Sequence, residues 1–252
     1  MDLNLGGKRA LVTGGSKGIG LAAARTLAAE GCAVTIVARD ADMLAAAAAQ
    51  LRAGGAEVGT IIGDLAGEGG IADVVERCGP LDILVNNAGA IPPGSFGDIE
   101  MERWRAAWDL KVFGYIALTR RLYDNLRRRR GVVINVIGAA GERFPAEYIA
   151  GSAGNAALMG FTRALAKNAH RDGIRIVGIN PGPVETERLA LMMQARAQRD
   201  LGNGDRWREL ISEMPFGRFA EPAEIADAVA FLASPRSGYT SGTILTIDGG
   251  AG

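Results

Sequence analysis

A glycine-rich turn near the N-terminus sets the strongest limit on the fold. The apolar run from Arg9 to Thr13 leads into the turn GGSKGIG, residues 14–20, and the turn leads into a helical pattern. This spacing puts glycines at the tight turn, at the closest approach of the backbone to a diphosphate and at the contact between helix and sheet. A purely structural turn is the alternative for an isolated glycine triplet. The strand before it and the helix after it favour a dinucleotide site, in which backbone amides and the helix N-terminus hold the diphosphate.

Short β-rich runs alternate with longer helical patterns along the whole chain. We predict seven strands, at Arg9–Thr13, Ala33–Ala38, Val58–Ile62, Ile83–Val85, Val132–Ile137, Arg175–Ile179 and Thr243–Ile247. Between them we predict helices at residues 18–30, 41–53, 68–78, 101–128, 152–171 and 222–233. This alternation predicts an α/β chain with a Rossmann-type, doubly wound parallel sheet of seven strands and helices on both faces.

The chain is predicted to be one domain. Its 252 residues show an even spread of glycine and apolar residues and no linker, so residues 1–252 are expected to form a single dinucleotide-binding domain. The segment from Glu187 to Pro215 breaks the alternation, because it is rich in methionine at first and then charged. Long insertions beside a binding crevice are often lids, so we expect a mobile substrate lid at about 187–215.

Composition excludes several classes of function. The chain has 28 basic and 28 acidic side chains, so no net field attracts nucleic acid or an anionic membrane. The basic run Arg127–Arg130 falls where a helix is predicted to end, and cations there complement the helix dipole. No apolar run is long enough to span a membrane, and no export signal precedes the first strand, so we expect a cytoplasmic protein.

Side chains suited to metal or thiol chemistry are few and isolated. Cys32 and Cys78 lack a CxxC or histidine-rich companion, so we expect no metal site. His170 is the only histidine and lies near the end of a predicted helix, where we expect it to be solvated. A serine–histidine–acid triad is therefore not expected.

The turn TGGSKGIG and three later motifs resemble the short-chain dehydrogenase/reductase family. Asp64 follows the third strand, NNAG occupies residues 86–89 at the end of the fourth, and a PG turn at 181–182 follows the sixth, with Thr186 beyond it. The resemblance covers essentially the whole chain and implies a nicotinamide dinucleotide whose adenine edge meets Asp64 and whose carboxamide meets Thr186. The expected cofactor-binding residues are Gly14, Ser16, Lys17, Gly18, Ile19, Gly20, Arg39, Asp64, Leu65, Asn87, Ala88, Gly89, Asn155, Pro181, Gly182, Val184 and Thr186.

Charge at the end of the second strand favours NADP(H) over NAD(H). An NAD-binding chain of this fold carries an acidic side chain there, which would repel a 2′-phosphate. This chain has Ala38 at that position and Arg39 next to it, and Lys17 and Ser16 lie in the glycine turn. Two cations and a hydroxyl could therefore converge on the phosphate. The alternative for Arg39 is a surface ion pair with Asp40 or Asp42.

The resemblance also implies a catalytic set, and this chain does not reproduce it. In the family a tyrosine is the acid and base, a lysine four residues later lowers its pKa, a serine stands thirteen residues before it and an asparagine lies in the long helix. Aligning the fifth strand places the serine at Gly138, the tyrosine at Gly151 and the lysine at Asn155. In the long helix, Gly114 and Leu118 place the asparagine at Lys111. This alignment predicts that all four residues are replaced.

Compared with the family's pattern, Lys111 stands at the position of the asparagine and Asn155 at the position of the lysine, so the two residue types are exchanged. An ammonium in the same cavity, if partly desolvated, could act as proton donor, oxyanion partner or amine nucleophile. The alternative is a solvated lysine on a long helix.

Tyr148 is a second candidate for the proton chemistry. It lies three residues before Gly151, and the glycines at 138 and 151 leave space for its ring if the helix has begun by then. Ser152, four residues after Tyr148, carries no charge to depress a phenol pKa, so the family arrangement is not reproduced. The alternative is a tyrosine that only packs or faces solvent.

These patterns favour an oxidoreductase that transfers hydride between NADP(H) and a small carbonyl or alcohol substrate through an unusual acid/base set, Lys111, Tyr148 and Asn155. One alternative is a non-redox enzyme, such as a lyase, hydratase or hydrolase, on the same fold. The other is a non-catalytic NADP-binding subunit or sensor. The resemblance implies a homotetramer or homodimer built on the long helices after the fourth and fifth strands.

Overall fold

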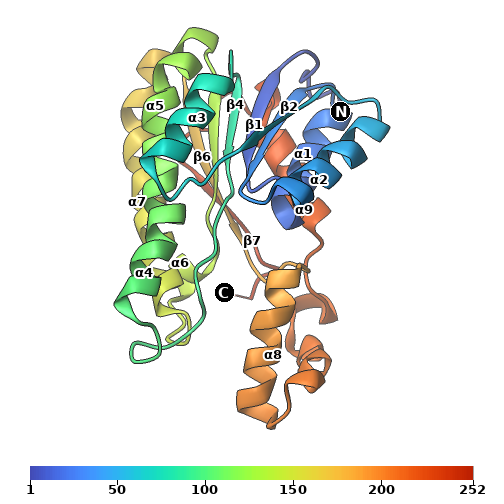
Figure 1. Ribbon diagram of the computed structural model, residues 1–252, viewed down its shortest axis with the longest axis vertical. Coiled ribbons are helices and arrows are strands. Elements are labelled where there is room, and N and C mark those ends of the chain that lie inside the picture. The colour runs from blue at the N-terminus through green and yellow to red at the C-terminus, as the bar shows by residue number, and fades with distance from the viewer. Residues whose placement is uncertain (252) are drawn as a thin grey trace.

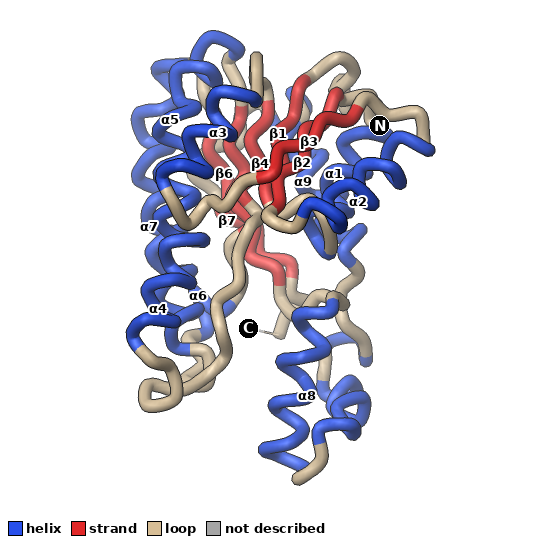
Figure 2. The backbone as a smooth tube through the Cα atoms, viewed as in Figure 1, coloured by secondary structure: helices blue, strands red, loops and turns tan. Residues whose placement is uncertain are grey.

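The computed structural model describes residues 1–251 and contains the predicted sheet (Figures 1 and 2). Seven strands lie in the order β3-β2-β1-β4-β5-β6-β7, and every neighbouring pair is parallel. Their bounds are β1 Arg9–Thr13, β2 Ala33–Ala38, β3 Val58–Ile62, β4 Ile83–Asn86, β5 Val132–Val136, β6 Arg175–Pro181 and β7 Ile244–Ile247. The prediction of a doubly wound sheet is confirmed. Its switch point, where the order reverses, lies between β1 and β4, and open sheets of this type bind ligands there.

Helices cover both faces of the sheet. One face packs against α1 (Gly18–Ala29), α2 (Ala41–Ala53) and α9 (Pro222–Ala233), and the other against α3 (Glu68–Arg77), α5 (Gly114–Arg129) and α7 (Ile149–Ala169). The central strand β5 is buried at every position and reads VVINV, as expected for a parallel strand with helices on both sides. This double burial holds the carboxyl ends of the central strands in fixed positions, and the site is built there.

Two helices differ from the prediction. The single helix expected at 101–128 is divided into α4 (Met101–Trp108), a π-helical turn η1 (Asp109–Phe113) and α5. Lys111 lies at the centre of the π turn, where one extra residue changes the direction of the side chains, and such turns recur at functional sites. Helix α7 begins at Ile149 and not at 152, so Tyr148 is its N-cap residue, just outside the helix.

Residues 187–215 are helical in the structure. They form α8 (Glu187–Leu201) and a 3₁₀ segment, η3 (Gly204–Glu213), which pack together around a small apolar cluster that includes Met193, Ala197 and Leu210. Figure 1 shows α8 extending beyond the sheet at the lower end of the view, where α4 also lies, with α4 at the left and α8 at the right. The remaining short segments are α6 (Ala140–Arg143), η2 (His170–Asp172), η4 (Pro215–Gly217) and η5 (Pro235–Ser237). In the described part of the chain, no helix combines the length and apolarity that crossing a bilayer requires.

Candidate functional site

A cavity of about 1680 Å³ lies at the carboxyl ends of the central strands. It runs from the glycine turn after β1, past the ends of β4, β5 and β6, to the first turns of α8. Dinucleotide and substrate would both fit a cavity of this size and position.

The glycine turn is built for close packing and for an anion. Gly14 has φ +64°, a left-handed conformation that favours glycine. A Cβ on Gly20 would overlap the carbonyl oxygen of Gly14, so helix and turn touch only because residue 20 has no side chain. Asn87 Nδ2 donates to the carbonyl oxygen of Thr13 at 3.0 Å and braces the turn from β4. The N-terminus of α1 has no side-chain cap, so its first amides remain available to a diphosphate.

Most of the predicted cofactor-binding residues line this one cavity. They are Gly14, Ser16, Lys17, Gly18, Ile19, Arg39, Leu65, Asn87, Ala88, Gly89, Asn155, Pro181, Gly182, Val184 and Thr186. Gly20 and Asp64 are not among the lining residues. Gly20 acts through the packing just described, and the exposed carboxylate of Asp64 accepts from the amide of Ala66 at 3.1 Å.

The two predicted phosphate-binding cations each have an acidic neighbour. Lys17 Nζ lies 2.9 Å from Glu187 Oε2, and Arg39 Nη1 lies 4.0 Å from Asp64 Oδ2. The alternative partners considered for Arg39, Asp40 and Asp42, do not form this pair. All four paired side chains are more than half exposed, so both pairs are weak and open to exchange for a ligand.

Lys111 and Asn155 meet at the end of β5. Lys111 Nζ donates to the carbonyl oxygen of Ile137 at 2.5 Å, and Asn155 Nδ2 donates to that of Gly138 at 3.3 Å. The structure therefore brings the two exchanged residues to consecutive carbonyl groups. Burial, and then the positive charge of Arg188, lower the pKa of Lys111 to about 7. The Oδ1 atom of Asn155 is buried without a hydrogen-bond partner in residues 1–251 and is free to accept from a ligand.

The ring of Tyr148 fills the space beside Gly151. A Cβ built on Gly151 would overlap Cε1 and Cζ of the Tyr148 ring. The backbone of Tyr148 is held against the loop after β4, because the amide of Gly94 donates to Glu147 O at 2.7 Å and the amide of Ile149 lies 3.4 Å from Gly94 O. Although Tyr148 precedes α7, its phenol thus occupies the position toward which a side chain at 151 would project.

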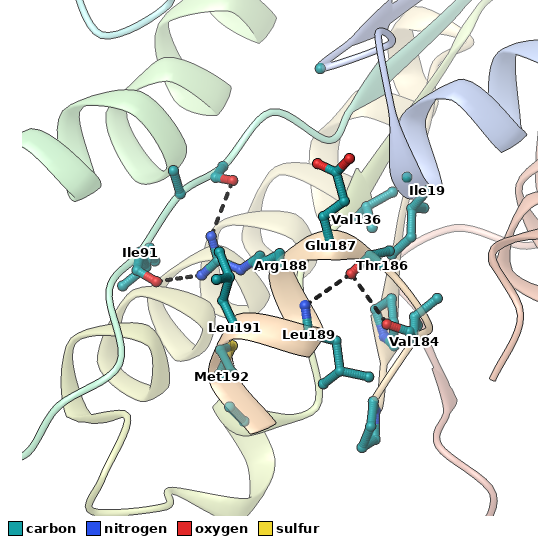
Figure 3. A pocket seen from close by; sticks show the side chains of 18 of the residues that line it. Ile19, Ile91, Val136, Val184, Thr186, Glu187, Arg188, Leu189, Leu191 and Met192 are labelled. Carbon is teal, nitrogen blue, oxygen red and sulfur yellow. Dashed lines mark hydrogen bonds between the residues drawn. The ribbon is translucent and has the colours of Figure 1, made fainter. Parts of the chain in front are cut away.

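Arg188 is a cavity residue that sequence reasoning missed. It lies in the first turn of α8 and reaches across to the loop after β4, as Figure 3 shows. Its Nη2 donates to the carbonyl oxygen of Ile91 and to Tyr148 Oη at 3.0 Å, and its Nη1 lies 3.5 Å from Gly89 O. The guanidinium therefore joins the expected lid to the candidate catalytic residues. No motif spacing marks it, because its role depends on the path of α8.

The two cysteines and the histidine are not among the residues that line the cavity. Both cysteines are buried, and burial raises the pKa of the Cys32 thiol to about 12, which disfavours a thiolate. His170 lies in η2 and is exposed. Over residues 1–251, histidine, cysteine, aspartate and glutamate form no cluster of three or more that could hold a metal ion.

Comparison with known proteins gives consistent matches. Residues 14–252 match the family described as Enoyl-(Acyl carrier protein) reductase. The chain is 35% identical over 250 residues to an acetoacetyl-CoA reductase of Allochromatium vinosum, across 96% of this chain and 97% of that protein.

Two solved structures are similar throughout. L-Sorbose reductase from Gluconobacter frateurii, complexed with NADPH and L-sorbose, has a TM-score of 0.91 and 34% identity, covering 99% of this chain and 98% of that one. An NADPH-bound short chain oxidoreductase from Pseudomonas aeruginosa, described as containing an atypical catalytic center, has a TM-score of 0.87 and 31% identity, covering 97% and 96%.

Proposed function

The chain belongs to the short-chain dehydrogenase/reductase family of oxidoreductases, and on that premise we propose that it interconverts a carbonyl compound and its alcohol with NADP(H), using Lys111, Tyr148 and Asn155. The observation that carries the proposal is the position of the Tyr148 phenol, which fills the space beside Gly151 while Lys111 and Asn155 lie at the end of β5. These three residues differ from the family's usual tetrad, and they still place proton-donating groups in one cavity.

Tyr148 is proposed to donate a proton to the substrate oxygen. Its Oη accepts a hydrogen bond from Arg188, so its own O–H hydrogen is free to point to a ligand. A guanidinium that donates to the phenol oxygen also stabilises the negative charge left when the proton departs. Lys111, with a pKa of about 7, is poised to replace that proton or to stabilise the developing oxyanion.

Asn155 and the glycine turn are proposed to orient the cofactor. When bound, the reduced dinucleotide supplies the hydride. The cradle fits it, because the uncapped N-terminus of α1 faces the cavity and the unpartnered Oδ1 of Asn155 can accept from a ribose hydroxyl. Arg39, Lys17 and Ser16 would hold the 2′-phosphate. The NADPH present in both solved relatives supports this choice of dinucleotide.

Replacing Arg39 tests the choice of dinucleotide. We expect Arg39→Ala to weaken NADP(H) binding at least about tenfold and to leave NAD(H) binding nearly unchanged, because a lost charge-assisted phosphate contact costs about 1.5 to 3 kcal/mol. Calorimetry measures both affinities, and Arg171→Ala, an exposed arginine in η2, is the matched control. Equal affinity of the parent protein for the two dinucleotides would contradict the assignment.

The ion pair between Lys17 and Glu187 gives a second test. If Lys17 leaves Glu187 to bind the 2′-phosphate, Glu187→Gln removes that competition, and NADP⁺ affinity should rise about 2- to 5-fold, since exposed ion pairs contribute up to about 1 kcal/mol. NAD⁺ affinity should not change. Glu185→Gln removes an exposed carboxylate that lines the same cavity and serves as the control. An equal rise for NAD⁺ would show that Glu187 acts on the cavity as a whole and not through Lys17.

Isotope transfer tests the reaction itself. NADPH carrying deuterium at the reacting carbon is incubated with the protein and a panel of ketones, aldehydes and oxo acids. The proposal expects an alcohol that contains deuterium. A panel that yields no labelled alcohol, from a protein that binds NADPH, would favour the non-redox enzyme or the dinucleotide sensor.

Two further properties are proposed. We propose that residues 187–215 form a substrate lid, since the first turns of α8 line the cavity and Arg188 links them to the loop after β4. We also propose a homotetramer or homodimer through α4, α5 and α7. The exposed side chains of Met101 and Phe113 on α4 and η1 support that surface, and light scattering measures the assembly.

A further inference from the structure

We propose that the substrate carries a carboxylate beside its reacting carbonyl, and that Arg188 and Lys111 form the subsite that binds this carboxylate. The inference rests on the function proposed above and names the substrate class for the same cavity. Its basis is the presence of two cations in one cavity, neither of which has an acidic partner within residues 1–251.

Neutral acceptors hold Arg188 in place. Its bonds to the carbonyl oxygens of Ile91 and Gly89 and to Tyr148 Oη fix the guanidinium without cancelling its charge. Figure 3 shows the side chain stretched from α8 towards the loop after β4. These bonds use three of the five N–H groups that an arginine offers, so donors remain for an anion. The guanidinium is thus held in a fixed orientation before a ligand binds, and its positive charge has no negatively charged partner among the described residues.

Lys111 is also held by a neutral acceptor and has no acidic partner in the part of the chain that the structure describes. Its ammonium donates to the carbonyl oxygen of Ile137, a neutral group. Both cationic side chains lie against Gly89, because Arg188 Nη1 is 3.5 Å from its carbonyl oxygen and a Cβ built on it would be 3.0 Å from Lys111 Cδ. Two like charges that are partly removed from water repel each other and lose hydration, and a bound anion relieves both costs.

The acidic side chains that line the cavity are engaged elsewhere or exposed. Glu187 pairs with Lys17, Glu213 pairs with Arg196, and Asp40 accepts from the amide of Met43. Asp98 accepts from the amide and hydroxyl of Ser95. Glu147 and Glu185 are exposed and form no ion pair with either cation. The described protein therefore provides no counter-ion for Arg188 or Lys111.

The hydrogen bond from Arg188 to Tyr148 sets the distance between the reacting carbonyl of the substrate and its carboxylate. A carbonyl oxygen that accepts the proton of Tyr148 lies one hydrogen bond from an oxygen that itself contacts the guanidinium at 3.0 Å. A carboxylate attached one or two bonds from that carbonyl carbon would reach Arg188. The chemistry is that of a 2-oxo or 3-oxo acid, or of the corresponding hydroxy acid.

The experiment compares acids with their neutral esters in equilibrium binding. Calorimetry measures the affinity of pyruvate against methyl pyruvate, and of acetoacetate against ethyl acetoacetate, slightly below neutral pH. Each pair is titrated into the protein alone and into its NADP⁺ complex, in which the oxidised cofactor cannot reduce the ketone. We expect at least one acid to bind about tenfold or more tightly than its ester. Arg188→Gln should abolish this preference, so that acid and ester bind with similar affinity.

Two control variants test whether the effect of Arg188→Gln comes from a general change in the structure. Arg188→Lys keeps the charge and should keep part of the preference for the acid. Arg196→Gln removes a cation from the same helix, one already paired with Asp200 and Glu213, and should have no effect. Retained binding of the ester shows that Arg188→Gln is folded.

Three results would overturn the subsite: no preference for either acid, an equal loss of acid and ester binding in Arg188→Gln, or no binding of any of the four compounds. Failure of the proposed oxidoreductase function would look different. In that case the preference for the acid and its dependence on Arg188 would be present, while no deuterium passed from NADPH to any carbonyl compound.

Discussion

Adding one methyl group at position 151 should lower kcat about 10²-fold or more, the range expected when a positioned proton donor is lost. The Cβ of Gly151→Ala would overlap the ring of Tyr148, so the phenol must leave the place it occupies beside α7. No reactive group is removed, and NADPH affinity should change little. Steady-state kinetics with a reducible carbonyl compound measures the effect.

Two comparisons distinguish displacement of the Tyr148 phenol from a general disturbance of α7. Gly160→Ala adds a Cβ on the same helix with nothing within 4 Å of it, and should leave kcat unchanged. The double variant Gly151→Ala/Tyr148→Phe should be no slower than the slower single variant, because both changes remove the same phenol. Additive losses would mean that Tyr148 is not what the methyl group displaces.

Lys111→Met should lower kcat/KM for carbonyl reduction by about 10² to 10⁴ and remove a titration from the pH profile. In the parent the ammonium form is the active one, and burial and Arg188 hold its pKa near 7, so reduction should slow as the pH rises through about 7. Lys111 donates to the carbonyl oxygen of Ile137 and is influenced by the charge of Arg188 from α8, and within residues 1–251 no carboxylate forms an ion pair with it. A titration that persists in Lys111→Met would assign it to another group.

The same substitution should stabilise the fold. The pKa of Lys111 is lower in the folded chain than its usual 10.5, so between pH 7 and 10.5 the unfolded chain binds more protons and unfolding free energy rises with pH. The penalty of the buried ammonium is therefore largest below pH 7. Because the side chain is only partly buried, we expect Lys111→Met to gain about 2 kcal/mol at pH 7. Denaturant unfolding of parent and variant at two pH values measures this gain and its loss at high pH.

The sheet was predictable because local patterns determine it. Buried parallel strands read as short apolar runs, and the glycine turn marks the first crossover, so every predicted strand lies within two residues of the observed bounds. The gathering of Lys111 and Asn155 was also predictable, because each aligns with a position of the family's catalytic set, Lys111 in the long helix and Asn155 after the fifth strand.

The rest of the site depends on tertiary contacts. A π turn differs from an α-helix by one residue in its hydrogen bonding, which apolar periodicity at 101–128 does not reveal. The ring of Tyr148 reaches the space beside Gly151 because the loop at Gly94 holds its backbone, a contact between segments about 54 residues apart. Arg188 enters the cavity only through the course of α8. Sequence patterns do not encode such long-range positions.

The most direct measurement is the rate of NADPH oxidation, followed by the absorbance of the reduced nicotinamide, in the parent, Tyr148→Phe, Lys111→Met and the double variant. It uses the carbonyl compound that accepts deuterium from labelled NADPH. The account predicts that each single variant loses about 10²-fold or more in kcat at unchanged NADPH affinity, and that the double variant loses less than the product of the two, because the residues serve one proton transfer. Oxidation that continues at the parent rate in both single variants would contradict it, since the proton would then come from another group.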